Sequence, residues 1–200
     1  TSRVSFKFNG KIYYGFKGDT LASALIANDV HLVGRSFKYH RPRGIMTAGS
    51  EEPNAIVQVN GDTAYTEPNV RATEIEIYEG LEASSQNCWP SVNFDVGGIN
   101  NVLSPILPAG FYYKTFMWPA SFWEKYEYVI RHSAGLGKSP KVADPDIYDH
   151  RYIHCDVLII GAGIAGIIAA KTAAKNNLKT LILDEKAEIG GTTIYQNSNN

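Results

Sequence analysis

One stretch near the C-terminal end of the chain constrains the fold more than any other. Asp156–Ile160 is almost wholly apolar and runs directly into the glycine-rich turn Gly161–Gly166. An alanine-rich segment follows, Ile167–Lys175, and then a second apolar run, Thr180–Leu183, which ends at an acidic pair. Apolar runs of this kind are typical of strands buried on both faces of a parallel sheet. We therefore expect a strand, a turn, a helix and a second, parallel strand.

The glycines of the turn lie where a bound dinucleotide requires them. Gly161 permits the tight turn from strand to helix, Gly163 lets a pyrophosphate approach the backbone, and Gly166 lets the helix pack closely on the strand. The helix N-terminus offers N–H groups to the phosphates. Asp184 follows Gly161 by 23 residues, where a carboxylate can hold ribose hydroxyls. These features predict the first β–α–β unit of a Rossmann-type dinucleotide-binding domain.

The acidic end of the second strand bears on which dinucleotide binds. Asp184 and Glu185 would repel a 2′-phosphate, which favours NAD or FAD over NADP. The motif alone does not distinguish NAD from FAD, because both dinucleotides bind to this β–α–β unit in the same way. Ile189–Thr193 then brings two more glycines and indicates a second backbone loop near the nucleotide.

The N-terminal part of the chain predicts a small domain that starts with a β-hairpin. Val4–Phe8 and Ile12–Phe16 flank Asn9-Gly10, a dipeptide whose residues both tolerate the positive φ angles of a tight turn. Either Asp19 or Thr20 then caps a helix with apolar residues at helical spacing.

Two further strands complete this first domain. The helix is expected to end at Asn28, and Ala55–Val59 and Thr73–Tyr78 are predicted as strands. Turn signals lie between the two strands, at Asn60–Asp62 and at Pro68-Asn69. A hairpin, a helix and further strands make a β-grasp, the architecture of ubiquitin and of plant-type ferredoxins.

The middle of the chain predicts an irregular connection and one aromatic helix. The segment from Ser84 to Ala109 is rich in Gly, Pro, Asn and Ser. Ser121 and Glu124 form a capping box, so a helix should begin at Phe122. Its apolar face carries Phe122, Tyr126, Val129 and Ile130. That face either packs on a neighbouring domain or subunit, or stacks on a base or a flavin.

A linker follows from Gly135 to His150, with returning Gly, Pro and Asp. We therefore divide the chain into a β-grasp domain at 1–98, a helical connection at 99–150 and the start of a dinucleotide-binding domain at 151–200. One β–α–β unit cannot bury both faces of its sheet, so we expect the domain to need more chain.

Several other kinds of site are not expected. Cys88 and Cys155 are the only cysteines, which leaves no iron–sulfur or cysteine-based zinc site, and two lone thiols fit a cytoplasmic protein. His150 and His154 have H-x3-H spacing but fall outside any predicted helix, so we predict no metal site. We expect no signal peptide and no membrane span.

The charge pattern gives no reason to expect nucleic acid as a partner. The formal net charge is -1. Arg35–Gly44 interleaves basic and aromatic residues, a pattern that can bind single-stranded nucleic acid. No broader basic field supports that interpretation, so we favour a basic loop against an acidic surface or solvent.

Several stretches beyond the glycine motif make the chain resemble the alpha subunits of heterotetrameric sarcosine oxidases. They are Gly34–Gly44 (GRSFKYHRPRG), Ser50–Ala55 (SEEPNA), Thr115–Lys125 (TFMWPASFWEK), Ala134–Pro140 (AGLGKSP) and Cys155–Gly166, with Asp184-Glu185. Such subunits are much longer, so the chain would be an N-terminal portion. The resemblance implies an α+β, ferredoxin-like β-grasp domain without a cluster, followed by an α/β domain that binds NAD.

The resemblance also implies a complex with partner beta, gamma and delta subunits. In that family FAD on the beta subunit serves sarcosine oxidation, FMN lies between the two subunits, and a later part of the alpha subunit binds tetrahydrofolate. Catalytic residues would lie outside this chain, and this portion alone would be inactive. The implied NAD contacts are Gly161, Gly163, Ala165, Gly166, Asp184, Glu185, Lys186 and Thr192.

Two alternatives stay open. One is a subunit of a related opine, proline or cyanide-forming glycine dehydrogenase or oxidase, whose first domain can carry cluster cysteines. The other is an assembly module without catalysis, in which NAD is a structural ligand.

Overall fold

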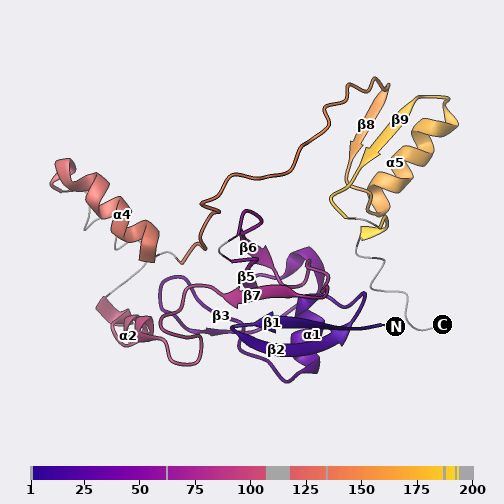
Figure 1. The fold of residues 1–200 in the computed structure, drawn as a ribbon. Helices are drawn as coiled ribbons and strands as arrows, with labels where there is room; N and C mark the ends of the chain where they lie inside the picture. The colour runs from indigo at the N-terminus through magenta and orange to yellow at the C-terminus, as the bar shows by residue number, and fades with distance from the viewer. Residues whose placement is uncertain are drawn as a thin grey trace. The chain divides into compact units, whose positions relative to one another are not determined.

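The chain consists of two compact units, residues Thr1–Pro145 and Asp146–Asn200 (Figure 1). The computed structural model describes residues 2–61, 63–106, 118–133, 135–186, 188–191 and 193.

The first unit opens with the predicted hairpin. Strands β1 (Arg3–Phe8) and β2 (Lys11–Phe16) pair antiparallel, with Arg3 opposite Phe16. Asn9 and Gly10 have φ angles of 51° and 78°, as the tight turn requires. Helix α1 (Leu21–Ala27) follows, and the Thr20 side chain caps it by accepting from the Ser23 N–H. Thr20 is therefore the cap, and the predicted end at Asn28 is confirmed.

A five-stranded mixed sheet in the order β2-β1-β7-β5-β6 forms the body of the unit. Strands β5 (Ile56–Val59), β6 (Glu67–Arg71) and β7 (Leu81–Ser85) join the hairpin, with β7 parallel to β1 and antiparallel to β5. The apolar residues of α1 and of the strands form one core, which includes Phe6, Phe8, Leu21, Leu25, Val57, Ile77 and Leu81. The predicted β-grasp architecture is confirmed.

The prediction of a strand at Thr73–Tyr78 is wrong. Ile77 is buried as the alternation implied, but this segment bonds to the start of α1 rather than to a sheet strand. The Leu21 N–H donates to the Ile75 carbonyl over 2.7 Å, and the Ile77 N–H donates to the Asp19 carbonyl over 2.9 Å. An extended segment can thus alternate between core and solvent without sheet partners.

The strands that flank this segment were missed. Pro68 and Asn69, predicted as a turn, lie inside β6. Ser84, predicted to open an irregular connection, lies inside β7, whose Leu81 and Ala83 are buried. Strand β7 is short, and only these two residues mark its buried face.

Glu52 organises the loop between β4 and β5. The short strands β3 (Gly34–Arg35) and β4 (Pro42–Arg43) pair antiparallel, and a 3-10 turn, Gly49–Glu51, precedes the glutamate. The Glu52 carboxylate is 1% exposed and accepts from four backbone N–H groups, those of Met46, Thr47 and Asn54 at 2.7 Å and of Ala55 at 3.1 Å. Burial would raise the pKa of Glu52, but these donors outweigh it and hold that pKa below its usual value.

The basic segment around β3 and β4 packs against the chain's own backbone. The Arg35 guanidinium donates to the carbonyl oxygens of Val92 at 2.8 Å, His40 at 3.2 Å and Asn93 at 3.3 Å. His40 Nδ1 lies 2.6 Å from a carboxylate oxygen of Asp95, and both side chains are largely buried. Arg35 and His40 therefore hold the segment that follows Asn87 in place.

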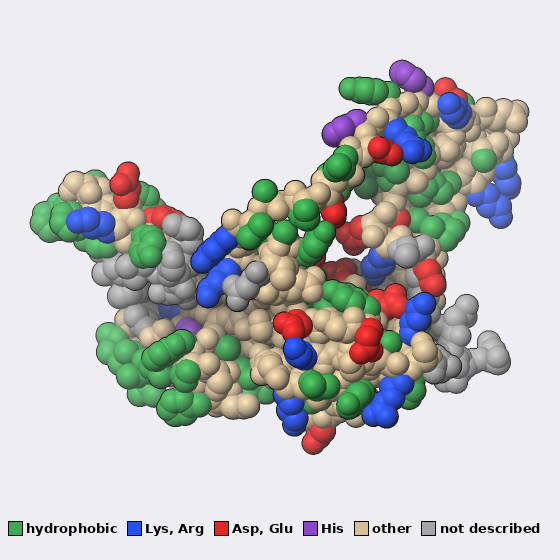
Figure 2. All heavy atoms as spheres, viewed as in Figure 1, with side chains coloured by type: hydrophobic (Ala, Val, Ile, Leu, Met, Phe, Trp, Pro, Cys, Tyr) green, Lys and Arg blue, Asp and Glu red, His purple; other side chains and the backbone are tan. Residues whose placement is uncertain are grey.

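That segment carries short helices instead of a wholly irregular chain. A 3-10 turn (Val96–Gly98) leads into α2 (Ile99–Val102), and a further 3-10 turn spans Ser104–Ile106. Large apolar side chains stay exposed here, as Figure 2 shows around α2: Trp89, Phe94, Val96, Ile99, Val102 and Ile106.

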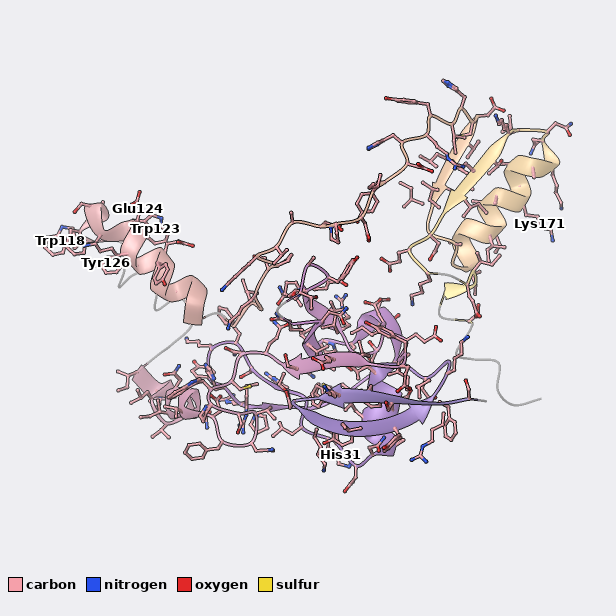
Figure 3. The ribbon with its side chains drawn as sticks, viewed as in Figure 1. His31, Trp118, Trp123, Glu124, Tyr126 and Lys171 are labelled. Carbon is pink, nitrogen blue, oxygen red and sulfur yellow. The ribbon has the colours of Figure 1, made fainter. Side chains whose placement is uncertain are left out.

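The aromatic helix exists but starts differently from the prediction. A 3-10 turn, Ala120–Phe122, precedes α4 (Trp123–Ser133), so Ser121 lies inside the turn and does not cap a helix that begins at Phe122. The rings of Phe122 and Tyr126 are 6.1 Å apart, which confirms that they share a face. Figure 3 labels Trp123 and Tyr126 on α4, and Trp118, which precedes the 3-10 turn. Phe111, Tyr112, Tyr113 and Phe116 lie outside the described residues.

The first residues of the predicted linker are bound to the sheet. The Gln58 carboxamide accepts from the Lys138 N–H at 2.9 Å and donates to the Lys138 carbonyl at 3.2 Å. Gln86 donates to the Gly135 carbonyl at 3.3 Å. The linker therefore begins after Lys138 rather than at Gly135.

The second unit is a β–α–β unit. Strand β8 (Val157–Ile160) and strand β9 (Thr180–Leu183) pair in parallel, with Val157 opposite Thr180, and α5 (Ile164–Lys175) connects them. The helix starts at Ile164, three residues before the predicted Ile167, because the turn ends at Gly163. In the described structure Leu158 and Ile160 are 51% and 83% exposed. One face of β8 is therefore uncovered, as expected of a single β–α–β unit.

In the parts of the chain that the structure describes, no helix combines the length and the apolar character needed to cross a membrane.

Replacing Glu52 with Gln should destabilise the first unit by about 1–3 kcal/mol, because one amide oxygen cannot satisfy the buried donors of two carboxylate oxygens. Since the pKa of Glu52 is lowered by folding, its stabilisation is complete above the pKa of the unfolded chain and is lost as pH falls through the lower folded value. Urea unfolding followed by tryptophan fluorescence checks this, because Trp89, Trp118 and Trp123 are the only tryptophans and all lie in the first unit. The control is Glu51→Gln, an exposed neighbour; equal stability of the two variants would contradict the role of Glu52.

Candidate dinucleotide-binding site

The glycine turn after β8 needs glycine at positions 161 and 166, for different physical reasons, whereas position 163 faces open space. Gly161 has a φ angle of +97°, and its N–H donates to the Leu183 carbonyl over 2.7 Å, which ties the turn to the end of β9. A Cβ on Gly166 would lie 1.9 Å from the Gly161 carbonyl oxygen, so this position cannot carry a side chain unless the helix moves. A Cβ on Gly163 would meet no atom within 4 Å.

The start of α5 leaves backbone donors available. Gly163 is the N-cap, and in the described structure no side chain caps the helix. The first helical bond runs from the Ile167 N–H to the Gly163 carbonyl over 2.9 Å. The N–H groups of Ile164, Ala165 and Gly166 precede it, as the unpaired donors of a helix N-terminus do. Such donors, with the helix dipole behind them, suit a phosphate.

The acid at the end of β9 reaches the glycine turn. Asp184 accepts from the Ala162 N–H at 2.5 Å through one oxygen and from the Lys186 N–H at 2.8 Å through the other. The bond from Ala162, followed by that from Lys186, lowers the pKa of Asp184. The turn and the end of β9 therefore meet in one place, as a shared nucleotide crevice requires.

The second glycine loop also lies at this place. The Gly190 N–H donates to the Ala162 carbonyl over 2.9 Å, and a Cβ on Gly191 would lie 3.0 Å from the Cα of Gly163. The loop predicted at Ile189–Thr193 thus contacts the first turn. Thr192 lies outside the described residues.

The structure brings most of the predicted residues into one neighbourhood. Asp184 accepts a hydrogen bond from Ala162, which lies between Gly161 and Gly163 in the turn. The first turn of α5 includes Ala165 and Gly166. Glu185 and Lys186 follow Asp184. The sequence did not single out Ala162, whose backbone bonds to both Asp184 and Gly190, because its side chain takes no part in those contacts.

Among the described residues, no group of three or more His, Cys, Asp or Glu side chains is placed to hold a metal ion. His150 and His154 lie in an irregular, exposed segment.

Comparison with known proteins matches each unit to a family. Residues 1–88 match the family described as "2Fe-2S iron-sulfur cluster binding domain", and residues 156–199 match "FAD dependent oxidoreductase". Sarcosine oxidase subunit alpha from Rhizobium meliloti is 59% identical over 96% of this chain. The chain belongs to the sarcosine oxidase alpha subunit family. The corresponding subunit from Corynebacterium strain U-96 is 32% identical over 94% of the chain.

The chain spans only a small part of these relatives, 19% of the Rhizobium subunit and 15% of the Corynebacterium subunit. Among solved structures, L-proline dehydrogenase from P. horikoshii aligns over 95% of this chain and 26% of its own, at 20% identity and with a TM-score of 0.47.

The residues of the first unit do not fit a [2Fe–2S] cluster. Such a cluster takes four cysteine thiolates, whereas the whole chain has two cysteines, Cys88 and Cys155. Burial, followed by the charge of Asp95, raises the pKa of the Cys88 thiol, which disfavours the thiolate that binds metal. The unit keeps the ferredoxin-like fold without the ligands of its cluster.

Replacing Gly166 with Ala should loosen the packing of α5 on β8, at a cost of about 1–3 kcal/mol. Helix propensity alone would favour alanine by about 1 kcal/mol, so a loss of stability reports the clash with the Gly161 carbonyl. Hydrogen exchange of the β8 and β9 amides, read by mass spectrometry, should be faster in this variant. The matched control is Gly163→Ala, where a Cβ enters open space; exchange as slow as in the wild type for Gly166→Ala would contradict the prediction.

Proposed function

We propose that the second unit binds NAD through its ADP half, as part of a sarcosine oxidase complex. The observation that carries this proposal is the open space over Gly163, beside the uncapped start of α5 and the acid that follows β9. A diphosphate suits the helix N-terminus, and an acidic strand end suits a ribose.

Each predicted residue takes a role in this binding mode. The backbone of Gly161, Gly163, Ala165 and Gly166 accommodates and binds the diphosphate. Asp184 and Glu185 supply the acidic end of β9 that the adenosine ribose needs, and we propose Lys186 and Thr192 as further contacts.

FAD is the alternative ligand. The match to FAD-dependent oxidoreductases supports it, since the β–α–β grip on the ADP half is the same for both dinucleotides. We favour NAD because the chain resembles alpha subunits in which NAD binds here, while FAD serves the beta subunit and FMN lies between the two.

The activity we propose belongs to the whole complex with beta, gamma and delta subunits, in the cytoplasm. There sarcosine, O₂ and tetrahydrofolate give glycine, methylenetetrahydrofolate and H₂O₂. The N-methyl carbon is oxidised and passes to the folate, and the two electrons reach oxygen. The 200 residues of this chain carry no group assigned to that chemistry, so we expect them to be inactive alone.

A subunit of an opine, proline or cyanide-forming glycine dehydrogenase is a less favoured alternative, because the cluster ligands that such first domains can carry do not occur here. The other alternative, an assembly module in which NAD is a structural ligand, is compatible with our proposal. The exposed apolar side chains around α2 favour contact with further protein.

Replacing Gly163 with Ala should weaken NAD binding at least tenfold while the chain stays folded, because the new methyl group occupies the space proposed for the diphosphate. Isothermal titration of the chain with NAD and, separately, with FAD measures this and tells the two ligands apart. Gly98→Ala is the control, since a Cβ there also meets open space but lies in the first unit. Unchanged affinity of Gly163→Ala for both dinucleotides would refute the site.

A further inference from the structure

We propose that a pocket of the first unit binds a small organic carboxylate, with Arg43 holding the carboxylate group and Phe37 covering an apolar body. The pocket has a volume of about 290 Å³. This volume is close to the lower end of the range of roughly 300–1,000 Å³ that small-molecule sites have. The inference does not depend on the proposed dinucleotide site, which belongs to the second unit.

Segments that are far apart in the sequence form the walls of this pocket. The β3–β4 hairpin and its loop contribute one wall, and residues next to β5 contribute another. Strand β6, the chain after β7 and the segment after α4 complete the lining. The pocket is therefore a product of the fold of the whole unit.

Side-chain amides join these walls to one another. The Asn87 carboxamide donates to the carbonyl oxygens of Ser36 at 2.6 Å and of Phe37 at 3.3 Å. The Gln86 carboxamide accepts from the Asn69 N–H at 2.8 Å and donates to the Asn69 side-chain oxygen at 2.8 Å. Walls that are fixed before a ligand arrives reduce the cost of ordering on binding.

Gly135 brings the segment after α4 against the same wall. Its carbonyl accepts from the Gln86 side chain, and its φ angle is +61°. A Cβ at this position would collide with the Asn87 side chain. The close approach of this segment to the pocket therefore requires glycine.

The lining of the pocket is positively charged. Arg35 and Arg43 line it, and no Asp or Glu is among its described lining residues. Arg35 donates to three carbonyl oxygens, so no described carboxylate pairs with its charge. Glu52 precedes two lining residues in the sequence, but four backbone N–H groups already bind its carboxylate. The pocket therefore favours an anion.

Arg43 has donors available for such an anion. Its side chain is exposed, and its guanidinium forms no hydrogen bond or ion pair with any described residue. A guanidinium presents parallel N–H donors that match the two oxygens of a carboxylate. Binding a carboxylate at Arg43 would thus cost the fold no existing bond.

Apolar side chains in the lining favour an organic anion over a bare inorganic one. Phe37 and Leu136 line the pocket and are 54% and 62% exposed. Ile56, which also lines it, is partly buried. An aromatic or aliphatic body would cover this apolar surface, whereas phosphate would leave it in water.

Three probes separate the two parts of the proposed site. Phenylacetate has a carboxylate and a ring, phenylacetamide lacks the charge, and acetate lacks the ring. In NMR titrations of the 200-residue chain, phenylacetate should bind at least tenfold more tightly than either of the others. The proposal is overturned if phenylacetate does not bind, or if acetate or phenylacetamide binds equally well.

Two variants assign the parts to residues. Arg43→Gln should reduce the affinity for phenylacetate to that for phenylacetamide, and Phe37→Ala should reduce it to that for acetate. Arg3→Gln is the matched control, because Arg3 is an exposed arginine of the same unit outside the pocket lining. Equal losses in Arg43→Gln and Arg3→Gln would refute the role of Arg43.

A measurement on the unaltered chain covers the case in which a variant does not fold. Phenylacetate should shift the amide signals of Gly34, Asn54 and Gly135, which line the pocket, and leave that of Gly18 unchanged. Shifts confined to the second unit would place the ligand elsewhere and overturn the proposal.

Discussion

The close approach of α5 to the end of β8 is the constraint on which the second unit depends. The Gly161 carbonyl occupies the place that a side chain at position 166 would need. The helix can therefore begin directly after the strand, and the N–H groups of its first residues lie beside the turn. Asp184 and Gly190 both bond to the backbone of Ala162, which lies in this turn between Gly161 and Gly163.

The first unit shows a different way of fixing irregular chain. Polar side chains bind the backbone of segments far away in sequence: Arg35 holds Val92 and Asn93, and Gln58 pairs with both backbone groups of Lys138. These side-chain hydrogen bonds satisfy backbone groups that have no neighbouring strand to pair with. They explain why a chain with many Gly, Pro and Asn residues after β7 still has a defined path there.

The sequence was sufficient to predict the elements whose structure depends on a few neighbouring residues. Asn9-Gly10 predicted the hairpin, Thr20 was one of two predicted caps, and the glycine spacing predicted the β–α–β unit. The strand predicted at Thr73–Tyr78 was wrong because alternation of apolar and polar residues indicates only that one side of the segment is buried. The sequence does not say whether the start of α1 or a neighbouring strand bonds to the backbone of this segment. Ser121 failed as a cap because a 3-10 turn preceded the helix.

The site was predicted less completely than the fold. The glycines and the acidic pair were recognised because side-chain type, or the lack of a side chain, marks them. The part played by Ala162 depends on main-chain atoms that every residue possesses, so no residue type signals it. The same holds for the two backbone N–H groups, of Ala162 and Lys186, that donate to Asp184.

The buried Glu52 has a consequence for how the first unit matures. In ferredoxins of this fold an inserted metal centre holds loops together, and folding is tied to iron and sulfide delivery. Here a carboxylate encoded in the chain gathers the backbone amides from Met46 to Ala55. This loop is therefore held by groups of the chain itself, where a ferredoxin uses a metal centre that has to be inserted.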